Sequence, residues 1–247
     1  MIKQYGLIGY PLSHSFSKKY FSEKFIKEKI SGCKYDLFEI ERIGLVESVF
    51  QKDNLQGFNV TIPYKHDIMN YMDDLDHSAQ KVGAVNVVKI CGDGKKTGFN
   101  SDYYGFRTSL ESWIPDLKNK KALILGIGGA AKAVIAVLED LGISFLKISR
   151  DKEKGELNYN ELMEQPKLLI DHHLVINTTP LGMSPHIDSK PQIDYEKLTN
   201  QHYLYDLIYN PAETKFLSDG NKFGANTKNG LEMLELQAEK SWEIWNQ

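Results

Sequence analysis

The strongest constraint on the fold is a regular alternation between short apolar runs and stretches with helical spacing. KQYGLIG, KYDLFEI and QGFNVTI are strand-like, and SKKYFSEKFIKEKI and GLVESVFQK separate them with a helical pattern. Alternation of this kind favours βαβ units around a mostly parallel sheet. The sequence therefore predicts an α/β fold, in which AVNVVKI and KKTGF close the first series as a hairpin around Gly92-Asp93-Gly94.

A second series of the same kind follows the polar stretch PDLKNK. KKALILG, SFLKISR, LVINTT and YLYDLIY are continuous apolar runs, which sheets covered on both faces require. A helix over 230–245 closes the chain and could return to the first domain. We therefore expect two domains, one formed by residues 1–103 with 229–247 and the other by residues 104–228.

Composition excludes several classes of partner. The 247 residues include 30 basic and 33 acidic side chains, a balance that argues against nucleic acid and anionic membranes. No signal-peptide region or membrane-spanning segment is apparent. Cys33 and Cys91 are far apart, which fits the cytoplasm and offers no zinc site. His172 and His173 are adjacent, so a loop pair is favoured over a metal site. We expect a cytoplasmic protein with no metal.

The segment ALILGIGGAAKAVIAVL contains a glycine loop between an apolar strand and an Ala-rich helix. Gly126-x-Gly128-x-x-Ala131 fits the dinucleotide fingerprint, which tolerates alanine in the third place. Glycine there permits a tight turn and lets backbone N–H groups approach a pyrophosphate at the positive end of the helix dipole. A purely structural turn is the alternative, but the strand, the helix and the βαβ context all favour a cofactor site.

Charged residues at the end of the next strand bear on which dinucleotide binds. Arg150 favours NADP, because a guanidinium can pair with the 2′-phosphate in two-pronged fashion. Asp151 argues the other way unless it points aside, because a carboxylate would repel that phosphate. A mixed surface charge run over 149–154 is the plain alternative. NADP is the expected cofactor.

A nicotinamide enzyme that reduces a ketone also needs a proton donor for the developing alkoxide. Tyr20 and Lys24 have the Tyr-x-x-x-Lys spacing of short-chain dehydrogenases, but they precede the glycine loop rather than follow it. Lys65 follows the strand FNVTIP, and Asp102 precedes a predicted helix. A free lysine, with a pKa near 10.4, needs a neighbouring group for reversible proton transfer, and Asp102 could supply it. Lysines after strands are otherwise usually solvated.

Motifs in order along the chain resemble those of the shikimate dehydrogenase family over essentially the whole length. Those of the first domain are GYPLSHSFS (9–17), NVTIPYK (59–65), GAVN (83–86) and NSD (100–102). Those of the second are GIGGA (126–130), RDKEK (150–154), NTTPLGM (177–183) and YDLIYNP (205–211), followed by GL (230–231) and Gln237 in the final helix. The resemblance implies a substrate-binding domain, a Rossmann-like NADP-binding domain and a C-terminal helix that returns to the first.

The resemblance also implies the site residues. Lys65 is the catalytic lysine and Asp102 its partner. Substrate contacts are implied for Ser15, Ser17, Thr61, Lys65, Asn86, Asp102, Tyr209 and Gln237. Cofactor contacts are implied for Gly126, Gly128, Gly129, Ala130, Ser149, Arg150, Lys154, Thr178, Leu207 and Gly230. A small carboxylate with three hydroxyls suits such hydroxyl and amide groups. From the residues alone, Ser15 and Ser17 could instead cap the next helix, and Asn86 could satisfy a turn.

The implied function is the reversible NADPH-dependent reduction of 3-dehydroshikimate to shikimate in chorismate and aromatic amino acid biosynthesis. The enzyme would act on this small molecule as a monomer or homodimer. One alternative is a quinate/shikimate dehydrogenase that uses NAD as well as NADP, and another is a non-catalytic sensor of shikimate-like ligands. Lys65 and Asp102 argue against a sensor, since a pure binder needs no proton relay. Ser101, Ser149 and Asp151 depart from the residues usual in the family, and the latter two leave the strength of NADP preference open.

Overall fold

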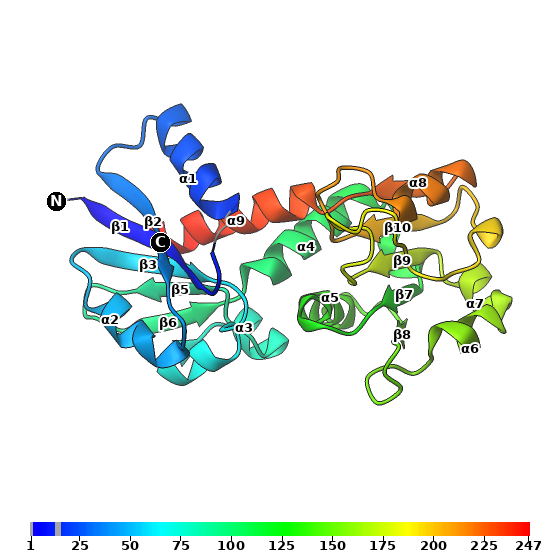
Figure 1. Cartoon of the computed structure of the whole chain (residues 1–247), viewed down its shortest axis with the longest axis horizontal. Helices are drawn as coiled ribbons and strands as arrows, with labels where there is room; N and C mark the ends of the chain where they lie inside the picture. The colour runs from blue at the N-terminus through cyan, green and yellow to red at the C-terminus, as the bar shows by residue number, and fades with distance from the viewer. Residues whose placement is uncertain (1, 13–15) are drawn as a thin grey trace. The chain divides into compact units, whose positions relative to one another are not determined.

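The computed structural model describes residues 2–12 and 16–247. The chain forms two compact units, Met1–Tyr104 with Gln237–Gln247 and Gly105–Leu236 (Figure 1). It passes between them inside two helices, α4 (Ser101–Trp113) and α9 (Leu231–Asn246). Each unit contains its own sheet, which confirms the two-domain α/β fold. Whether the functional domains end at the expected residues stays a prediction.

The sheet of the first unit has the strand order β2-β1-β3-β5-β6-β4. β1 runs parallel to β2 and β3, whereas β5 is antiparallel to β3 and β6. The predicted hairpin is thus confirmed as β5–β6. The strands are β1 (Lys3–Gly9), β2 (Cys33–Glu39), β3 (Leu55–Val60), β4 (Asp74–Leu75), β5 (Val87–Ile90) and β6 (Lys96–Phe99). The helices are α1 (Phe16–Lys27), η1 (Ile43–Leu45), α2 (Val46–Phe50), η2 (Asp67–Tyr71) and α3 (His77–Val82).

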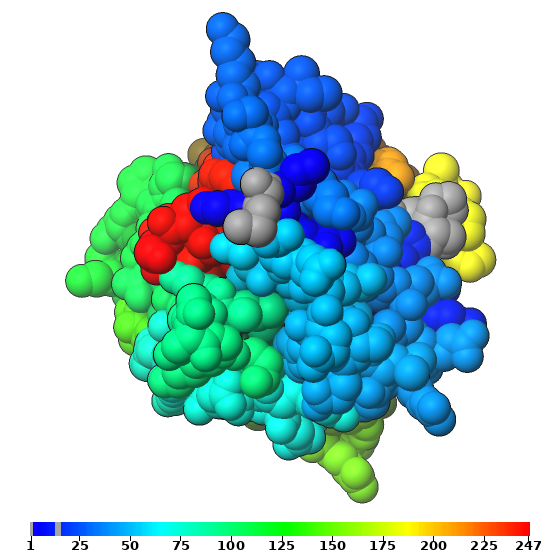
Figure 2. Space-filling view, turned by 90° about the vertical axis from the view of Figure 1, so that its left-hand side faces the viewer, coloured from blue at the N-terminus to red at the C-terminus, as the bar shows by residue number. Residues whose placement is uncertain are grey.

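Aromatic side chains at the end of α9 complete the core of the first unit. Trp245 is buried against Tyr5 of β1, with ring centroids 4.9 Å apart, and its indole N–H donates to the carbonyl of Val88 at 3.0 Å. Gly57 makes room for it, because a Cβ there would lie 2.5 Å from the indole nitrogen. The red end of α9 accordingly lies beside the dark-blue N-terminal strand in Figure 2. The predicted return of the last helix is confirmed.

The sheet of the second unit has the order β11-β10-β9-β7-β8, and its described pairings are all parallel. β7 and β9 are buried along their whole length, as continuous apolar runs predict. The strands are β7 (Ala122–Leu125), β8 (Phe145–Ile148), β9 (Leu174–Asn177), β10 (Tyr203–Asp206) and β11 (Asn226–Lys228). The helices are η3 (Leu117–Asn119), α5 (Gly129–Asp140), α6 (Tyr159–Met163), α7 (Pro166–Asp171), η4 (Tyr195–Lys197) and α8 (Lys215–Lys222).

The strand order of the second unit reverses at β7, which pairs with β8 on one side and β9 on the other. Open parallel sheets bind ligands outside the carboxyl ends of their strands at such a reversal. The topology therefore marks the carboxyl ends of β7 and β9 as the binding edge. Within the residues described, no helix combines the length and apolar character needed to cross a bilayer.

Candidate active site

Lys65 and Asp102 form an ion pair in the first unit. The Lys65 Nζ donates to Asp102 Oδ2 at 2.6 Å. The two side chains keep 34% and 24% of their surface exposed, so a reactant can reach both. Asp102 lies in the first turn of α4, where the helix dipole stabilises a carboxylate. The structure thus brings together the two residues that the sequence singled out for proton transfer.

The turn that carries Lys65 is anchored on both sides. The carbonyl of Lys65 accepts from the Val85 N–H at 2.7 Å. Tyr64, which is buried, donates its hydroxyl to the carbonyl of Ile40 at 2.6 Å. Asn100 Oδ1 accepts from the Tyr103 N–H at 3.1 Å and so caps the helix that bears Asp102. Because the backbone is fixed beside both residues, the distance between them is set by the fold.

Asn86 and Gln237 are held through their amide oxygens. Asn86 Oδ1 accepts from the Ser101 N–H at 2.6 Å, and Gln237 Oε1 accepts from the Ser101 hydroxyl at 3.1 Å. An amide whose oxygen is occupied presents its NH₂ group to any further partner. Both predicted substrate residues are therefore oriented as donors, which suits the oxygens of a hydroxylated acid.

A buried polar network lies behind these amides, and the sequence pattern did not identify its members as a group. Asn59 Oδ1 accepts from the Tyr35 hydroxyl at 2.8 Å, and Asn59 Nδ2 donates to the Ser241 hydroxyl at 2.9 Å. Burial raises the pKa of Tyr35, and a hydrogen bond with the Ser17 side chain partly offsets this. Only Asn59 carried a signal, because it opens the motif NVTIPYK.

The remaining substrate candidates are divided between the two units. Thr61 follows β3 and lies against Gly9, where a Cβ would come within 2.5 Å of the Thr61 methyl group. Ser15 lies outside the described residues. Tyr209 is 41% exposed and belongs to the second unit, whereas Thr61, Asn86 and Gln237 belong to the first.

The glycine loop of the second unit has the geometry that a dinucleotide phosphate requires. Gly126 adopts φ +91°, and a Cβ there would lie 2.3 Å from the Thr179 methyl group. Gly128 is the N-cap of α5 and Gly129 its first residue, and the space that a Cβ would occupy at either is open to 4 Å. Backbone N–H groups of the first helical turn, including that of Ala130, are thus approachable by an anion. The residues present fit a dinucleotide.

Three further predicted cofactor residues follow β9, β10 and β11, and Thr178 among them contacts this loop. The Thr178 hydroxyl donates to the carbonyls of Leu125, at 3.1 Å, and of Gly126. The Leu207 N–H donates to the carbonyl of Asn177 at 3.0 Å. Gly230 packs on Leu207, since a Cβ would lie 2.2 Å from the Leu207 carbonyl oxygen. The structure thus gathers Gly126, Thr178, Leu207 and Gly230 at the edge that the strand order marks.

The charged loop after β8 resolves the conflict between Arg150 and Asp151. The Asp151 carboxylate pairs with Lys154 Nζ at 3.0 Å and accepts from the Glu153 N–H at 3.1 Å, and these bonds lower the pKa of Asp151. The Ser149 hydroxyl accepts from the Asp151 N–H at 3.1 Å. Arg150 is exposed and makes no hydrogen bond or ion pair with the part of the chain that the structure describes. Its guanidinium is available to a phosphate, which fits NADP.

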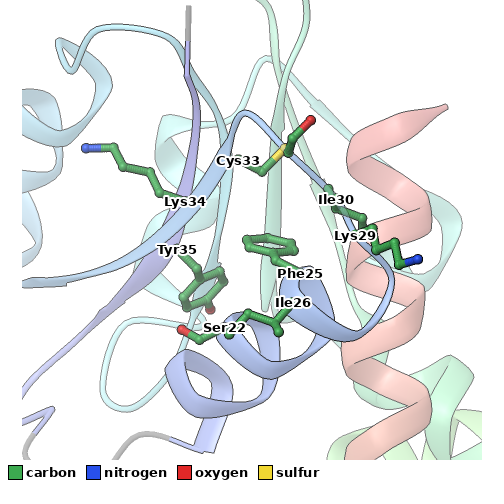
Figure 3. Close-up of a pocket in the computed structure, with 9 residues that line it drawn as sticks. Ser22, Phe25, Ile26, Lys29, Ile30, Cys33, Lys34 and Tyr35 are labelled. Carbon is green, nitrogen blue, oxygen red and sulfur yellow. The ribbon is translucent and has the colours of Figure 1, made fainter.

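A separate pocket of about 560 Å³ lies between α1 and β2 (Figure 3). Its lining is Ser22, Phe25, Ile26, Lys29, Ile30, Ser31, Cys33, Lys34 and Tyr35. None of the predicted site residues lines it. Across residues 2–12 and 16–247, no group of three or more metal-binding side chains is placed to hold a metal ion, and the expectation of a metal-free enzyme stays a prediction.

Residues 7–88 match the family model described as the shikimate dehydrogenase substrate binding domain. A shikimate dehydrogenase (NADP(+)) of Clostridium beijerinckii is 42% identical over 256 residues, covering 98% of this chain and 92% of that protein. A chorismate mutase/shikimate 5-dehydrogenase fusion protein from Clostridium acetobutylicum has a crystal structure with TM-score 0.88 and 37% identity, covering 100% of this chain and 92% of that chain. The crystal structure of a shikimate 5-dehydrogenase from Listeria monocytogenes, in complex with shikimate and NAD, has TM-score 0.89 and 30% identity. It covers 99% of this chain and 92% of that chain.

The fold, the residues gathered at the ends of its strands and the similarity to known enzymes together define the class of this protein. It is a two-domain α/β oxidoreductase that uses a nicotinamide cofactor. The chain belongs to the shikimate dehydrogenase family, which confirms the resemblance seen in its motifs.

Proposed function

We propose that this chain catalyses the reversible NADPH-dependent reduction of 3-dehydroshikimate to shikimate, as a step in chorismate and aromatic amino acid biosynthesis. The observation that carries the proposal is the Lys65–Asp102 pair at 2.6 Å, in a chain of this family. Beside the pair, Asn86 and Gln237 are oriented as donors by Ser101. A ketone reduction needs such a proton donor next to groups that fix the substrate.

The proton is the part of the reaction that this chain's own residues supply. NADPH, when bound, supplies the hydride that adds to the carbonyl carbon. Lys65 Nζ gives a proton to the carbonyl oxygen as the hydride arrives, and it accepts that proton in the reverse direction. Asp102 holds the Lys65 ammonium in place and compensates its charge while the proton moves. The partial exposure of both side chains lets the proton be replenished from solvent.

Substrate contacts are assigned to Ser15, Ser17, Thr61, Lys65, Asn86, Asp102, Tyr209 and Gln237. Cofactor contacts are assigned to Gly126, Gly128, Gly129, Ala130, Ser149, Arg150, Lys154, Thr178, Leu207 and Gly230. The open space over Gly128 and Gly129 supports the phosphate contacts. The free guanidinium of Arg150 supports NADP over NAD, although Lys154 is engaged by Asp151.

Initial rates with shikimate and with quinate, each with NADP⁺ and with NAD⁺, test this function. Shikimate with NADP⁺ is expected to give the highest kcat/KM of the four combinations. A higher value for quinate with NAD⁺ would instead establish a quinate dehydrogenase. Binding of shikimate without reduction of either cofactor at any pH would leave only the ligand sensor.

The cellular setting is also a proposal. Cys33 and Cys91 are both free thiols, and thiols persist in the reducing cytoplasm. We assign the protein to that compartment, as a monomer or homodimer acting on a small molecule. Cell fractionation and light scattering of the purified protein check these two statements.

A further inference from the structure

Asp206, the last residue of β10, carries a carboxylate that is completely buried at the binding edge of the second unit. Its Oδ1 accepts from Asn177 Nδ2 at 3.0 Å and from the Ile208 N–H at 3.1 Å. Its Oδ2 accepts from the Thr214 hydroxyl at 2.6 Å. All three donors are neutral, and in the described residues Asp206 makes no ion pair. One carboxylate thus joins the end of β9 to the chain that follows β10.

The bond to Asn177 continues toward the glycine loop. Asn177 Oδ1 accepts from the Thr179 N–H at 3.0 Å and from the Thr179 hydroxyl at 2.6 Å. The methyl group of Thr179 in turn fills the space beside Gly126, which cannot accept a Cβ there. Asp206 thus orients the residues that follow β9, whereas Gly126 keeps its own backbone bond to the carbonyl of Ile148 at 2.8 Å.

The other bonds of Asp206 fix the chain that follows β10. Thr214 is the N-cap of α8 and accepts from the Leu217 N–H at 3.4 Å. Thr214 also packs on Gly182, where a Cβ would lie 3.2 Å from the Thr214 Cβ. The carbonyl of Ile208 accepts from the Gly230 N–H at 3.0 Å. The segments 178–182, 207–214 and 230 thus meet around one buried group.

A buried carboxylate without an ion-pair partner in the part of the chain that is described is a poor choice for stability alone. Burial raises the pKa of Asp206 to about 6, although its bonds to Thr214, Ile208 and Asn177 counteract part of the shift. The desolvation cost of such a charge exceeds what neutral donors return. The residue is better explained by what it positions, namely the segments that contain Thr178, Leu207 and Gly230.

We infer that Asp206 is a positioning residue that holds the three segments contacting the nicotinamide half of NADP(H). The inference rests on the proposed function, which assigns Thr178, Leu207 and Gly230 to the cofactor. These three residues follow β9, β10 and β11, on the other side of β7 from Ser149 and Arg150 at the end of β8, so they are assigned to the nicotinamide half. It adds a residue that touches neither substrate nor cofactor and acts through Asn177, Ile208 and Thr214. The adenine half of the cofactor, at Ser149 and Arg150, lies outside the bonds that Asp206 makes.

The test compares two ligands on the same variants by calorimetry: NADP⁺, and adenosine 2′,5′-bisphosphate, which lacks the nicotinamide half. Asp206→Ala is expected to weaken NADP⁺ binding by about tenfold or more, since it leaves buried donors unpaired, with little change for the bisphosphate. Asp206→Asn, which keeps a side-chain acceptor for Asn177 and Ile208, should restore most of the NADP⁺ affinity. Asp171→Ala removes an exposed carboxylate of the same unit and is the matched control.

Thr214→Val and Thr214→Ser form a second pair that keeps Asp206 intact. Valine removes the hydroxyl and should weaken NADP⁺ selectively, whereas serine should behave like the wild type. Normal NADP⁺ affinity in folded Asp206→Ala or in Thr214→Val overturns the inference, as does an equal loss for both ligands. A wild-type protein that binds the bisphosphate but not NADP⁺ would overturn the nicotinamide assignments. Failure to bind either ligand would overturn the proposed function itself.

Discussion

The two units treat a functional carboxylate in opposite ways. In the first unit Asp102 is partly exposed and paired with a lysine, and the neighbouring Ser101 belongs to a network of neutral amides and hydroxyls. In the second unit Asp206 is fully buried, and the donors bonded to it in the described part of the chain are all neutral. A charge that must exchange a proton has to remain within reach of reactant and solvent. A charge that only holds segments together can be buried, at a cost in stability.

The largest expected effect is on catalysis, when the ion pair between Lys65 and Asp102 is removed. Lys65→Ala should lower kcat by about a hundredfold or more, because it removes the proton donor and leaves Asp102 unpaired. Steady-state rates in both directions measure this effect. Lys34→Ala removes an exposed lysine that pairs with Asp36 in the same unit, and its turnover should match the wild type. Near-normal turnover in Lys65→Ala would remove the catalytic role of this lysine.

The buried carboxylate of Asp206 should make the free energy of unfolding depend on pH. The pKa of Asp206 in the folded protein, about 6, lies above its ordinary value of 3.8, so the folded state binds more protons than the unfolded state between these values. The free energy of unfolding therefore falls as pH rises through this window, and the cost is fully present above pH 6.

Asp206→Asn carries no such charge, so its stability relative to the wild type should increase with pH. The gain should be larger at about pH 7 than at about pH 4 by about 2 kcal/mol, on the usual conversion of a pKa shift. Urea denaturation of both proteins at the two pH values measures the difference. A gain that does not change with pH would contradict the burial of a charge at this position.

Arg150 tests the other end of the cofactor site. Arg150→Ala should raise KM for NADP⁺ by about tenfold and leave KM for NAD⁺ nearly unchanged, because only NADP⁺ carries the 2′-phosphate. Initial rates with both cofactors measure the ratio, and NAD⁺ serves as the internal control. Parallel changes for the two cofactors would show that Arg150 does not read the phosphate.

The smallest expected effect concerns the neutral network of the first unit. Ser241→Ala removes the hydroxyl that accepts from Asn59 and should cost about 1 kcal/mol of stability, with a rise in KM for shikimate rather than for NADP⁺. Ser22→Ala is a matched control, because Ser22 and Ser241 each donate to a carbonyl four residues earlier, but Ser22 is exposed. Equal effects of the two substitutions would argue against support of the substrate site by Ser241.

The sequence predicted the parts of the fold that leave a local pattern. The strands β7 and β9 are apolar along their length and are buried. The last helix has apolar residues on one side, including Trp245, which is buried. The short strands β4 and β11 left no such pattern, because they are two and three residues long and their described positions are exposed or only partly buried. Backbone pairing with a neighbouring strand is what defines them.

The same distinction holds for the site. Lys65 follows a strand and Asp102 lies at the start of a helix, so their proximity could be predicted from the sequence. The structure places them in contact. Tyr35, Ser241 and Asp206 could not be identified as supporting residues, because their bonds join positions 24, 182 and 29 residues apart in the chain. Burial of a polar side chain is decided by such distant partners, which no local pattern encodes.

The first unit is assembled from both ends of the chain, since residues 237–247 join residues that precede 105. During synthesis the ribosome therefore releases all of the second unit before the first can close around Trp245. Until then the space beside Gly57 and Tyr5 has no occupant. A truncated product that stops short of Ala238 would retain the glycine loop yet carry an open aromatic core, which is the kind of surface that cellular proteases and chaperones recognise. The packing of the first unit is thus completed only by residues that follow the whole of the second unit in the chain.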